Sequence, residues 1–281
     1  MRFMTWNIHS MVEGNSEHQL RFLEQLVLEK DIELLALQEV NQRDDAPLAS
    51  EVLLAESGAL EVESKVPLRA DNFALQLCWR LRQQAEAWHF AWTAAHVGYA
   101  HLEEGIALLS RHSLTALRAV PLTEDMPIAQ QAALPAHGMD DWRRRVALMG
   151  RLEGTWVCTT HCGWWHDEKA PFAPQWARLE AALPAGEPAV VMGDLNNPAE
   201  IRGEGYDMLM EKGWQDAWAC ADTRDAGWTA RAGIDGWHGA RLQTMRLDYL
   251  LCRPARECSC CWTVAREDVS DHAGIWADIA L

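Results

Sequence analysis

The segment at residues 189–197, Ala-Val-Val-Met-Gly-Asp-Leu-Asn-Asn, is an apolar run that ends abruptly in Gly-Asp-x-Asn. Such a run predicts a buried strand that delivers polar side chains to its end, where ligand sites form. The same pattern returns at residues 3–7, 32–39, 156–161 and 245–248, and Ser270-Asp271-His272 precedes the last apolar run. A site shared by these strand ends requires both ends of the chain to fold together. We therefore expect a single domain over residues 1–281.

The expected elements open with a strand, a helix and a second strand, as in a βαβ unit. Residues 1–7 alternate like a strand, and residues 16–19 have the form of a capping box, with Ser16 as the N-cap and Gln19 reaching back. Asp71 is expected to cap a second helix through Leu81. Further strands are expected at residues 32–40, 90–99, 104–111, 144–152 and 155–161, helices at 175–183 and 206–212, and a long surface loop at 121–137.

The charge balance limits the partners of this chain. The 281 residues include 25 basic and 41 acidic side chains, which gives a net charge of −16. Nucleic-acid binding draws its non-specific affinity from Lys and Arg, so the balance argues against a duplex as partner. The one dense basic segment is Arg143-Arg144-Arg145. A solvated or ion-paired face is its commoner interpretation; the functional one, which we keep for Arg145, is an anchor for a substrate phosphate.

Cysteine usage and hydropathy bear on the compartment. Eight cysteines are far from disulfide density in a chain of this length, and most sit singly in apolar segments, so we expect reduced core thiols. Cys258, Cys260 and Cys261 lack the paired spacing of a zinc site. The N-terminus enters a strand pattern without a secretory signal, and no run approaches the roughly 18 apolar residues of a membrane span. We expect a cytoplasmic protein without membrane contact.

Polar groups at strand ends are usually turn or cap residues when taken singly, but here they form an ordered set. The set comprises Asn7 in Thr-Trp-Asn, Glu39 in Leu-Gln-Glu-Val, His161 in Thr-Thr-His, Asp194 and Asn196 in Gly-Asp-Leu-Asn, Asp248 in Arg-Leu-Asp-Tyr, and Asp271 and His272 in Ser-Asp-His. Over the whole chain, this set resembles the endonuclease/exonuclease/phosphatase superfamily. The resemblance implies an α/β (α+β) fold: a four-layer αββα sandwich with two mixed sheets packed face to face and helices outside.

The resemblance also implies a magnesium-dependent phosphoesterase site at one edge of the sheets. Glu39 is the expected direct ligand of Mg²⁺, with Mn²⁺ as the alternative ion. Asn7 and Asp271 are expected to complete or orient the metal shell. Oxygen ligands agree with this assignment, because Mg²⁺ prefers carboxylates and keeps several waters.

The same resemblance assigns catalytic roles to five residues. Asp194 is the preferred base for the attacking water, and Asn196 is a hydrogen-bond donor to the phosphate. His272, whose tautomer Asp248 fixes, is the second candidate for taking the proton, and the choice between Asp194 and His272 stays open. His161 is expected to stabilise developing negative charge.

The tryptophans suggest what the substrate carries besides phosphate. The chain has 15, and most are expected to pack in the core or around it. Trp164, Trp165 and Trp237 lie in polar loops, and flat aromatic faces suit sugar rings or bases. We expect these three to flank a sugar, with His166 or Asp167 available for its hydroxyls.

The long loops permit a narrower match. The segments at residues 160–168, 193–200, 203–207 and 234–237 resemble the bacterial maltose 6'-phosphate phosphatase branch of the superfamily. Cys162 departs from that pattern, since a larger apolar residue is expected there, so the shape of the neighbouring pocket is open. The expected activity is hydrolysis of a sugar phosphomonoester. The alternatives are a magnesium-dependent endonuclease, exonuclease or other phosphodiesterase and, less favoured, a binding module without turnover.

Polar groups outside the motifs receive a structural interpretation. Glu104 precedes a family-like strand at residues 106–110, and both a substrate contact and a solvated turn position stay open for it. The histidines without a surrounding motif are expected to be ordinary surface or core residues: His9, His18, His89, His96, His101, His137 and His238.

Overall fold

The computed structural model describes residues 1–12, 15–84, 87–99, 101–123, 139, 141–234, 236–238 and 240–281. Most of the loop expected at residues 121–137 lies outside these ranges, as do His137 and Asp235. Within the described residues, no helix is both long and apolar enough to cross a membrane.

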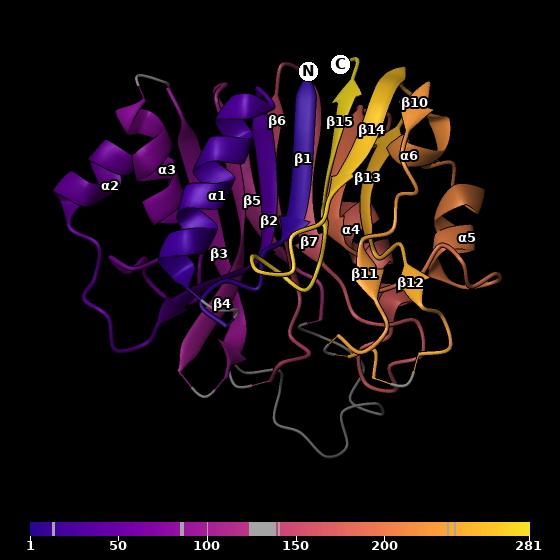
Figure 1. The fold of residues 1–281 in the computed structure, drawn as a ribbon, viewed down its shortest axis with the longest axis horizontal. Helices are drawn as coiled ribbons and strands as arrows, with labels where there is room; N and C mark the ends of the chain where they lie inside the picture. The colour runs from indigo at the N-terminus through magenta and orange to yellow at the C-terminus, as the bar shows by residue number, and fades with distance from the viewer. Residues whose placement is uncertain are drawn as a thin grey trace.

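Two mixed β-sheets form the body of the molecule (Figure 1). The seven-stranded sheet has the order β10 (Thr223–Arg224), β14 (Cys258–Val264), β15 (Gly274–Ile279), β1 (Arg2–Asn7), β2 (Leu34–Arg43), β4 (Leu102–Ser110) and β3 (His89–Gly98). The six-stranded sheet has the order β5 (Thr115–Pro121), β6 (Val146–Leu152), β7 (Thr155–His161), β8 (Ala189–Asp194), β13 (Asp248–Arg253) and β9 (Gln215–Asp216). A separate ribbon pairs β11 (Ala230–Arg231) with β12 (Thr244–Met245).

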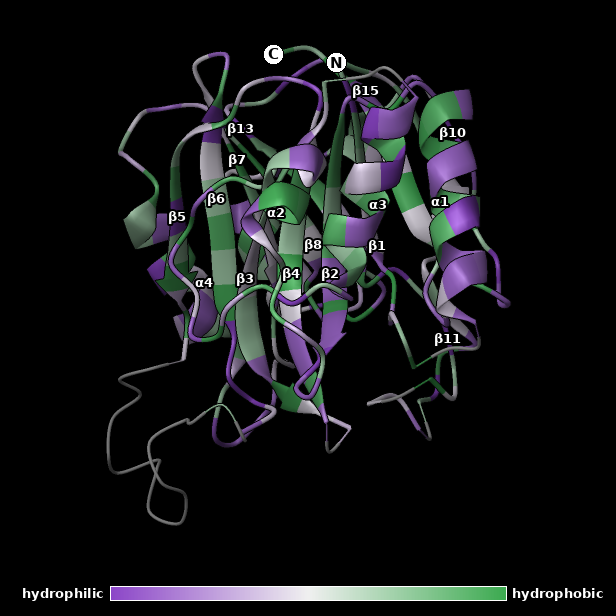
Figure 2. Cartoon of the chain, turned by 90° about the vertical axis from the view of Figure 1, so that its left-hand side faces the viewer, coloured by the Kyte–Doolittle hydropathy of each residue, from purple (hydrophilic) through white to green (hydrophobic). Residues whose placement is uncertain are grey.

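Three large apolar clusters separate four layers. One lies between the sheets and contains Phe3, Val190 and Met192. The second lies between the seven-stranded sheet and the helices α1 (Ser16–Glu29), α2 (Glu51–Ser57) and α3 (Phe73–Gln83). The third lies between the six-stranded sheet and the helices α4 (Phe172–Ala182) and α5 (Gly205–Glu211). The short α6 (Ala217–Cys220) adjoins the cluster between the sheets. Figure 2 shows mainly hydrophobic strands beneath helices with mixed surfaces. The four-layer sandwich that the sequence predicts is therefore confirmed.

Two helix caps differ from the expectation by one residue. Asn15, not Ser16, is the N-cap of α1, where its side chain accepts a hydrogen bond from the backbone of Glu17. Gln19 does not reach back to the cap, because its buried amide spans the backbones of Ile8 and Val269. Asn72 takes the place expected for Asp71 at α3. Asn and Asp side chains cap helices almost equally well, so sequence alone does not separate adjacent candidates.

The strand expected at residues 245–248 is wrong in its bounds. Asp248 begins β13 and does not end a preceding strand. Because β13 runs antiparallel to β8, the start of β13 still meets the end of β8, and Asp248 pairs in register with Asp194. On the other side of β8, the parallel neighbour β7 pairs His161 with Asp194. Three candidate residues thus stand side by side at one edge of the six-stranded sheet.

Candidate active site

Strand alternation directs these side chains between the two sheets. Side chains on a strand alternate between its faces, so Asp194 shares the face of Val190 and Met192, which belong to the core between the sheets. Asn7 of β1 likewise shares the face of Phe3. The polar side chains at the ends of both sheets therefore meet at the end of this core. Because they are buried there, they must form hydrogen bonds with one another.

Asp194 is the centre of the resulting network. Its Oδ2 accepts a hydrogen bond of 3.1 Å from Nδ2 of Asn7, in the opposite sheet, and lies 3.5 Å from Nε2 of His161. Its Oδ1 accepts from the backbone N–H of Asn196 at 2.8 Å. Burial, with the charge of Asp248, raises the pKa of Asp194 to about 7. A carboxylate with this pKa can hold or release a proton near neutral pH.

Gly193 allows Asp194 to take this position. Its φ of +144° is open only to glycine, and an added Cβ would lie 1.9 Å from the carbonyl oxygen of Thr160 in β7. The close approach of the two strands explains why the sequence reads Gly-Asp at this point.

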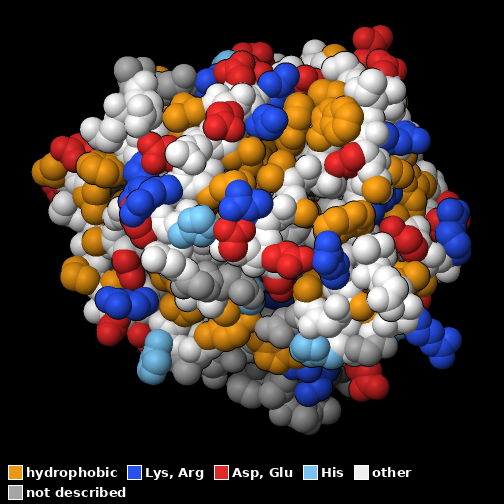
Figure 3. Space-filling model, in the orientation of Figure 1, with side chains coloured by type: hydrophobic (Ala, Val, Ile, Leu, Met, Phe, Trp, Pro, Cys, Tyr) orange, Lys and Arg blue, Asp and Glu red, His pale blue; other side chains and the backbone are white. Residues whose placement is uncertain are grey.

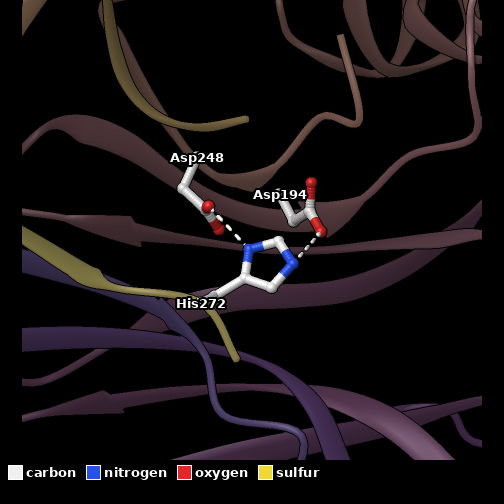
Figure 4. A group of neighbouring side chains, drawn as sticks. All are labelled: Asp194, Asp248 and His272. Carbon is white, nitrogen blue, oxygen red and sulfur yellow. Dashed lines mark hydrogen bonds and ion pairs between the residues drawn. The ribbon is translucent and has the colours of Figure 1, made fainter. Parts of the chain in front are cut away.

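His272 lies between two carboxylates, as Figure 4 shows. Its Nδ1 is 2.9 Å from Oδ2 of Asp248, and its Nε2 is 3.7 Å from Oδ2 of Asp194. Burial opposes a charge on the imidazole, but Asp248 and Asp194 together raise the pKa of His272 well above its usual value. Asp248 thus places the Nδ1 proton and leaves Nε2 directed toward Asp194.

His161 and Asn196 form a second pair, with a tautomer set by their neighbours. The indole N–H of Trp237 donates to Oδ1 of Asn196 at 3.0 Å, and Nδ2 of Asn196 donates to the carbonyl of Cys162 at 3.1 Å. These contacts orient the amide, so its Nδ2 also faces Nε2 of His161 at 3.0 Å as a donor. The His161 proton then resides on Nδ1, because Nε2 accepts. Burial and Arg145 lower the pKa of His161, which favours the neutral ring.

Glu39 completes the buried polar group from β2. Its Oε1 accepts from Nδ2 of Asn7 at 2.8 Å. Glu39 has a left-handed φ of +52° and lies where the register of β2 against β4 shifts, between Leu37 and Val40. Such bulges redirect side chains near active sites, at a cost in backbone strain. Burial and the charge of Glu104 raise the pKa of Glu39 to about 8.

A cavity of about 230 Å³ opens above this network. We call the polar residues of the network the floor: Asn7, Glu39, His161, Asp194, Asn196, Asp248, Asp271 and His272. Around the opening stand Tyr99, Trp142, Trp164 and Gly236, which we call the rim. Trp142 and Trp164 meet edge to face, with ring centroids 5.7 Å apart. The side walls carry His9, His96, Glu104 and Arg145.

Arg145 lines the cavity as expected, but the arginine segment is not a solvated face. Arg144 and Arg145 are 3 % and 4 % exposed. Arg145 donates to the carbonyl of Trp142 at 2.8 Å, and no described carboxylate forms an ion pair with it. Arg143 lies 3.5 Å from Asp167. The guanidinium of Arg145 is therefore available to an anion in the cavity.

Three expected substrate contacts lie outside the cavity. Trp165 packs against Phe172 beneath the six-stranded sheet. Asp167 accepts from the backbones of Lys169 and Ala170 and so closes its own loop. His166 is exposed and pairs with Glu204 at 2.9 Å. Trp164 is the member of this segment that reaches the rim, and Trp237 reaches the floor through Asn196.

Several cavity residues have no motif in the sequence that indicates them. His9 was expected to be an ordinary histidine, yet its Nε2 and Nδ1 lie 3.6 Å from Glu39 and Asp271, respectively. His96 received the same interpretation and instead pairs with Glu104 inside the cavity at 3.1 Å. Glu104 is a buried strand residue, so the turn interpretation is wrong. Burial opposes its charge, but His96 and Arg145 lower the pKa of Glu104.

The sequence matches a family model, that of the Endonuclease/Exonuclease/phosphatase family, over residues 4–272. The chain belongs to this family. Members of the endonuclease/exonuclease/phosphatase family are phosphoric ester hydrolases, so the chain is a hydrolase, and such enzymes generally depend on divalent metal ions. Among the curated proteins, a search with this sequence finds no match.

Solved structures share the fold at low sequence identity. An endonuclease/exonuclease/phosphatase family protein from Leptotrichia buccalis has a TM-score of 0.79 and 22% identity, with 100% of both chains covered. A mannosyl-6-phosphatase from Bacteroides thetaiotaomicron has a TM-score of 0.63 and 14% identity, again over 100% of both chains. A 3' phosphatase from Neisseria, bound to a product DNA hairpin, has a TM-score of 0.61 and 18% identity over 100% of both chains.

Two groups of floor residues offer ligands for the divalent ion of this family. Asp194, Asp248 and His272 have ligand atoms within 4.8 Å of one another. In that group, however, His272 is already hydrogen-bonded to Asp248. Glu39, with Asn7 and Asp271 beside it, fits a cation better. Its carboxylate is partly buried, and burial together with the charges of Glu104 and Asp271 raises its pKa. A divalent ion would relieve that repulsion with the oxygen ligands it prefers.

Proposed function

We propose that this chain is a divalent-metal-dependent phosphomonoesterase that acts on the phosphate ester of a mono- or disaccharide. The cavity carries the proposal: a floor of acid–base groups lies beneath an open rim that carries three aromatic side chains, in a volume of about 230 Å³. This is below the roughly 300–1,000 Å³ of pockets for drug-sized ligands. A phosphate and one sugar ring suit such a space better than a nucleic-acid duplex does.

The charges support a small anionic substrate. Arg145 is the one Lys or Arg among the described residues that line the cavity. We assign it to the substrate phosphate, because a planar guanidinium matches phosphate oxygens. On the face drawn in Figure 3, the described Lys and Arg side chains are scattered among Asp and Glu, and the chain carries a net charge of −16. A polyanionic strand gains little from such a surface.

The floor supplies the proton transfers of hydrolysis. We assign Asp194 to orient the attacking water, since its carboxylate faces the cavity and is held by Asn7 and by the backbone of Asn196. Asp248 keeps a proton on Nδ1 of His272, and the imidazole can carry a positive charge beside the Asp194 carboxylate. Nδ1–H of His161 is the donor that this residue offers to a phosphoryl oxygen. Asn196 contributes mainly by fixing that tautomer.

Glu39, with Asn7 and Asp271, would hold the divalent ion, Mg²⁺ or Mn²⁺. When bound, this ion supplies Lewis-acid stabilisation of phosphoryl and leaving-group oxygens. The residues named here act as its oxygen ligands or as groups that orient those ligands.

The bacterial maltose 6'-phosphate phosphatase branch remains our choice within the family. Its support is the loop at residues 160–168, of which Trp164 stands at the rim, and the mannosyl-6-phosphatase among the similar structures. Residues 1–281 are proposed to form one domain, because β15 near the C-terminus pairs with β1 at the N-terminus. The eight free cysteines agree with a reducing compartment such as the cytoplasm.

Inorganic phosphate release from a panel of sugar phosphates, maltose 6'-phosphate included, tests the proposal. Each reaction is run with Mg²⁺, with Mn²⁺ and with chelator, beside nicking of plasmid DNA and release of phosphate from a 3'-phosphorylated DNA hairpin. We expect chelator-sensitive release from sugars and intact plasmid. DNA turnover with inert sugar phosphates would overturn the proposal in favour of an activity like that of the Neisseria 3' phosphatase.

A further inference from the structure

The wall of the cavity contains a buried pair of side chains, His96 and Glu104, that the proposed reaction does not use. Nε2 of His96 lies 3.1 Å from Oε1 of Glu104, and each residue is 5 % exposed. Both line the same cavity as the floor residues. A buried carboxylate loses its hydration, so it needs a partner in the folded protein.

Strand geometry directs this pair into the cavity. In β4, Glu104 shares the face of Ile106 and Leu108, which belong to the core between the sheets. The neighbouring Glu103 faces the opposite side, where Arg69 pairs with it at 2.7 Å. Strict alternation would place His96 on that opposite side too. The register of β3 against β4 shifts between Ala94 and His96, which brings His96 opposite Glu104.

The Glu104 carboxylate keeps unused acceptor capacity. His96 is the only described side chain that donates to it. A carboxylate has about four lone-pair positions and no proton to donate when ionised. Its Oε2 lies beside Gly98, which also lines the cavity, at 3.4 Å from the position of an added Cβ. A ligand group that fills this side of the cavity can therefore donate a hydrogen bond to Oε2.

We propose that Glu104, held by His96, is a hydroxyl-binding subsite that selects phosphomonoesters of neutral polyols. This inference rests on the proposed function and narrows its substrate class. Sugar hydroxyls donate to the carboxylate, whereas a second phosphate on the same substrate meets a like charge. The subsite thus favours a singly phosphorylated sugar over a sugar bisphosphate and over an aryl phosphate, which has no hydroxyl to donate.

Glu104→Gln tests the subsite, and Glu103→Gln is its matched control. Kinetics are measured with glucose 6-phosphate or the best sugar phosphate of the panel, with the matching bisphosphate, and with phenyl phosphate. For Glu104→Gln we expect the ratio of KM for sugar phosphate to KM for phenyl phosphate to rise about 5- to 10-fold, since a charge-assisted hydrogen bond becomes a neutral one. Turnover of the bisphosphate should improve relative to the monophosphate. Glu103→Gln should leave both ratios unchanged.

Gly98→Ala is an independent variant that alters no charge. Its methyl group would stand at contact distance from Oε2 of Glu104 and from the ring of His96, without backbone strain. We expect the same selective rise in KM for sugar phosphate. If Glu104→Gln does not fold, Gly98→Ala decides alone, and an unchanged KM ratio overturns the subsite.

The outcomes separate this inference from the proposed function. A wild-type enzyme that releases phosphate from no sugar phosphate contradicts the proposed function itself. If the wild type is a sugar phosphatase and Glu104→Gln loses sugar and phenyl phosphate activity equally, only the subsite is contradicted. Glu104 would then act through its charge on the neighbouring Glu39.

Discussion

The floor and the rim of the cavity are built by different means. Most floor side chains come from strand ends or from residues close to them, and Glu39 comes from a bulge within β2. Cross-sheet contacts such as the hydrogen bond between Asn7 and Asp194 hold them in place. The rim comes from connecting segments, and Tyr99 and Trp142 are 52 % and 43 % exposed. A preorganised floor suits the reaction itself, whereas loops adapt to the rest of the substrate. Floor substitutions should therefore lower kcat, and rim substitutions should raise KM.

The largest effect is expected for Glu39→Gln. Loss of the assigned metal ligand should lower kcat/KM by about 10³-fold or more. Thermal unfolding without metal should be unchanged or slightly higher at pH 7, because burial raises the pKa of Glu39 and makes its charge unfavourable in the folded state. Phosphate release and the unfolding midpoint are measured together.

Glu33→Gln is the control for Glu39→Gln. Glu33 binds the backbone N–H of Arg2 at 2.7 Å, away from the cavity. This variant should keep its activity and lose some stability. Turnover by Glu39→Gln at the wild-type rate would refute the metal assignment.

Asp248→Asn should lower kcat by about 10²- to 10⁴-fold. An amide in place of the carboxylate can invert the tautomer of His272 and removes the main charge that supports its protonation. The measurement is the pH profile of kcat, with the exposed Asp222→Asn as control. A loss below tenfold, with an unchanged profile, would remove His272 from the proton transfers.

Trp237→Phe probes a residue between floor and rim. The substitution keeps an aromatic ring but removes the N–H that orients Asn196 and, through it, His161. One such hydrogen bond is worth about 1 kcal/mol, so kcat should fall about 5- to 10-fold at nearly constant KM. Trp228→Phe is the matched control. A selective rise in KM for sugar phosphate would instead show that Trp237 contacts the sugar, as the sequence alone suggests.

The smallest effect is expected at the rim, where Trp164 stands while the adjacent Trp165 is turned away from the cavity. Trp164→Ala should raise KM for sugar phosphate about fivefold, with kcat little changed, because Trp164 lines the opening. Trp165→Ala should leave KM unchanged and lower the unfolding midpoint, because Trp165 packs on Phe172. Equal KM values for the two variants would contradict the placement of Trp164, and not Trp165, at the rim.

The floor could be predicted from the sequence because its residues stand in short motifs at or near strand ends. Glu39 is the exception in position, because β2 continues past it to Arg43. Asp194, His161 and Asp248 meet through strand register alone, so the error in the bounds of β13 did not separate them. The ordered set of motifs also led to the sandwich fold. Local sequence and sheet geometry point to the same arrangement here.

Apart from Arg145, Trp164 and the alternative left open for Glu104, the walls and rim could not be predicted in the same way. Strict alternation places His96 on the helix side of β3, and only the register shift in the folded sheet brings it to Glu104. Trp164 and Trp165 look alike in the sequence, yet long-range packing sends one to the rim and the other beneath the sheet. Such choices depend on contacts between distant segments, which no local pattern records.

The hydrogen bond between Asn7 and Asp194 joins one sheet to the other across 3.1 Å. A displacement of one layer against the other by about 1 Å would carry these atoms beyond hydrogen-bond range while leaving each sheet intact. Turnover therefore depends on the position of one sheet relative to the other, whereas the circular dichroism signal depends on the strands within each sheet. In rising urea, hydrolysis should fade before the sheet signal does, so its loss is the earliest sign that the sandwich is loosening.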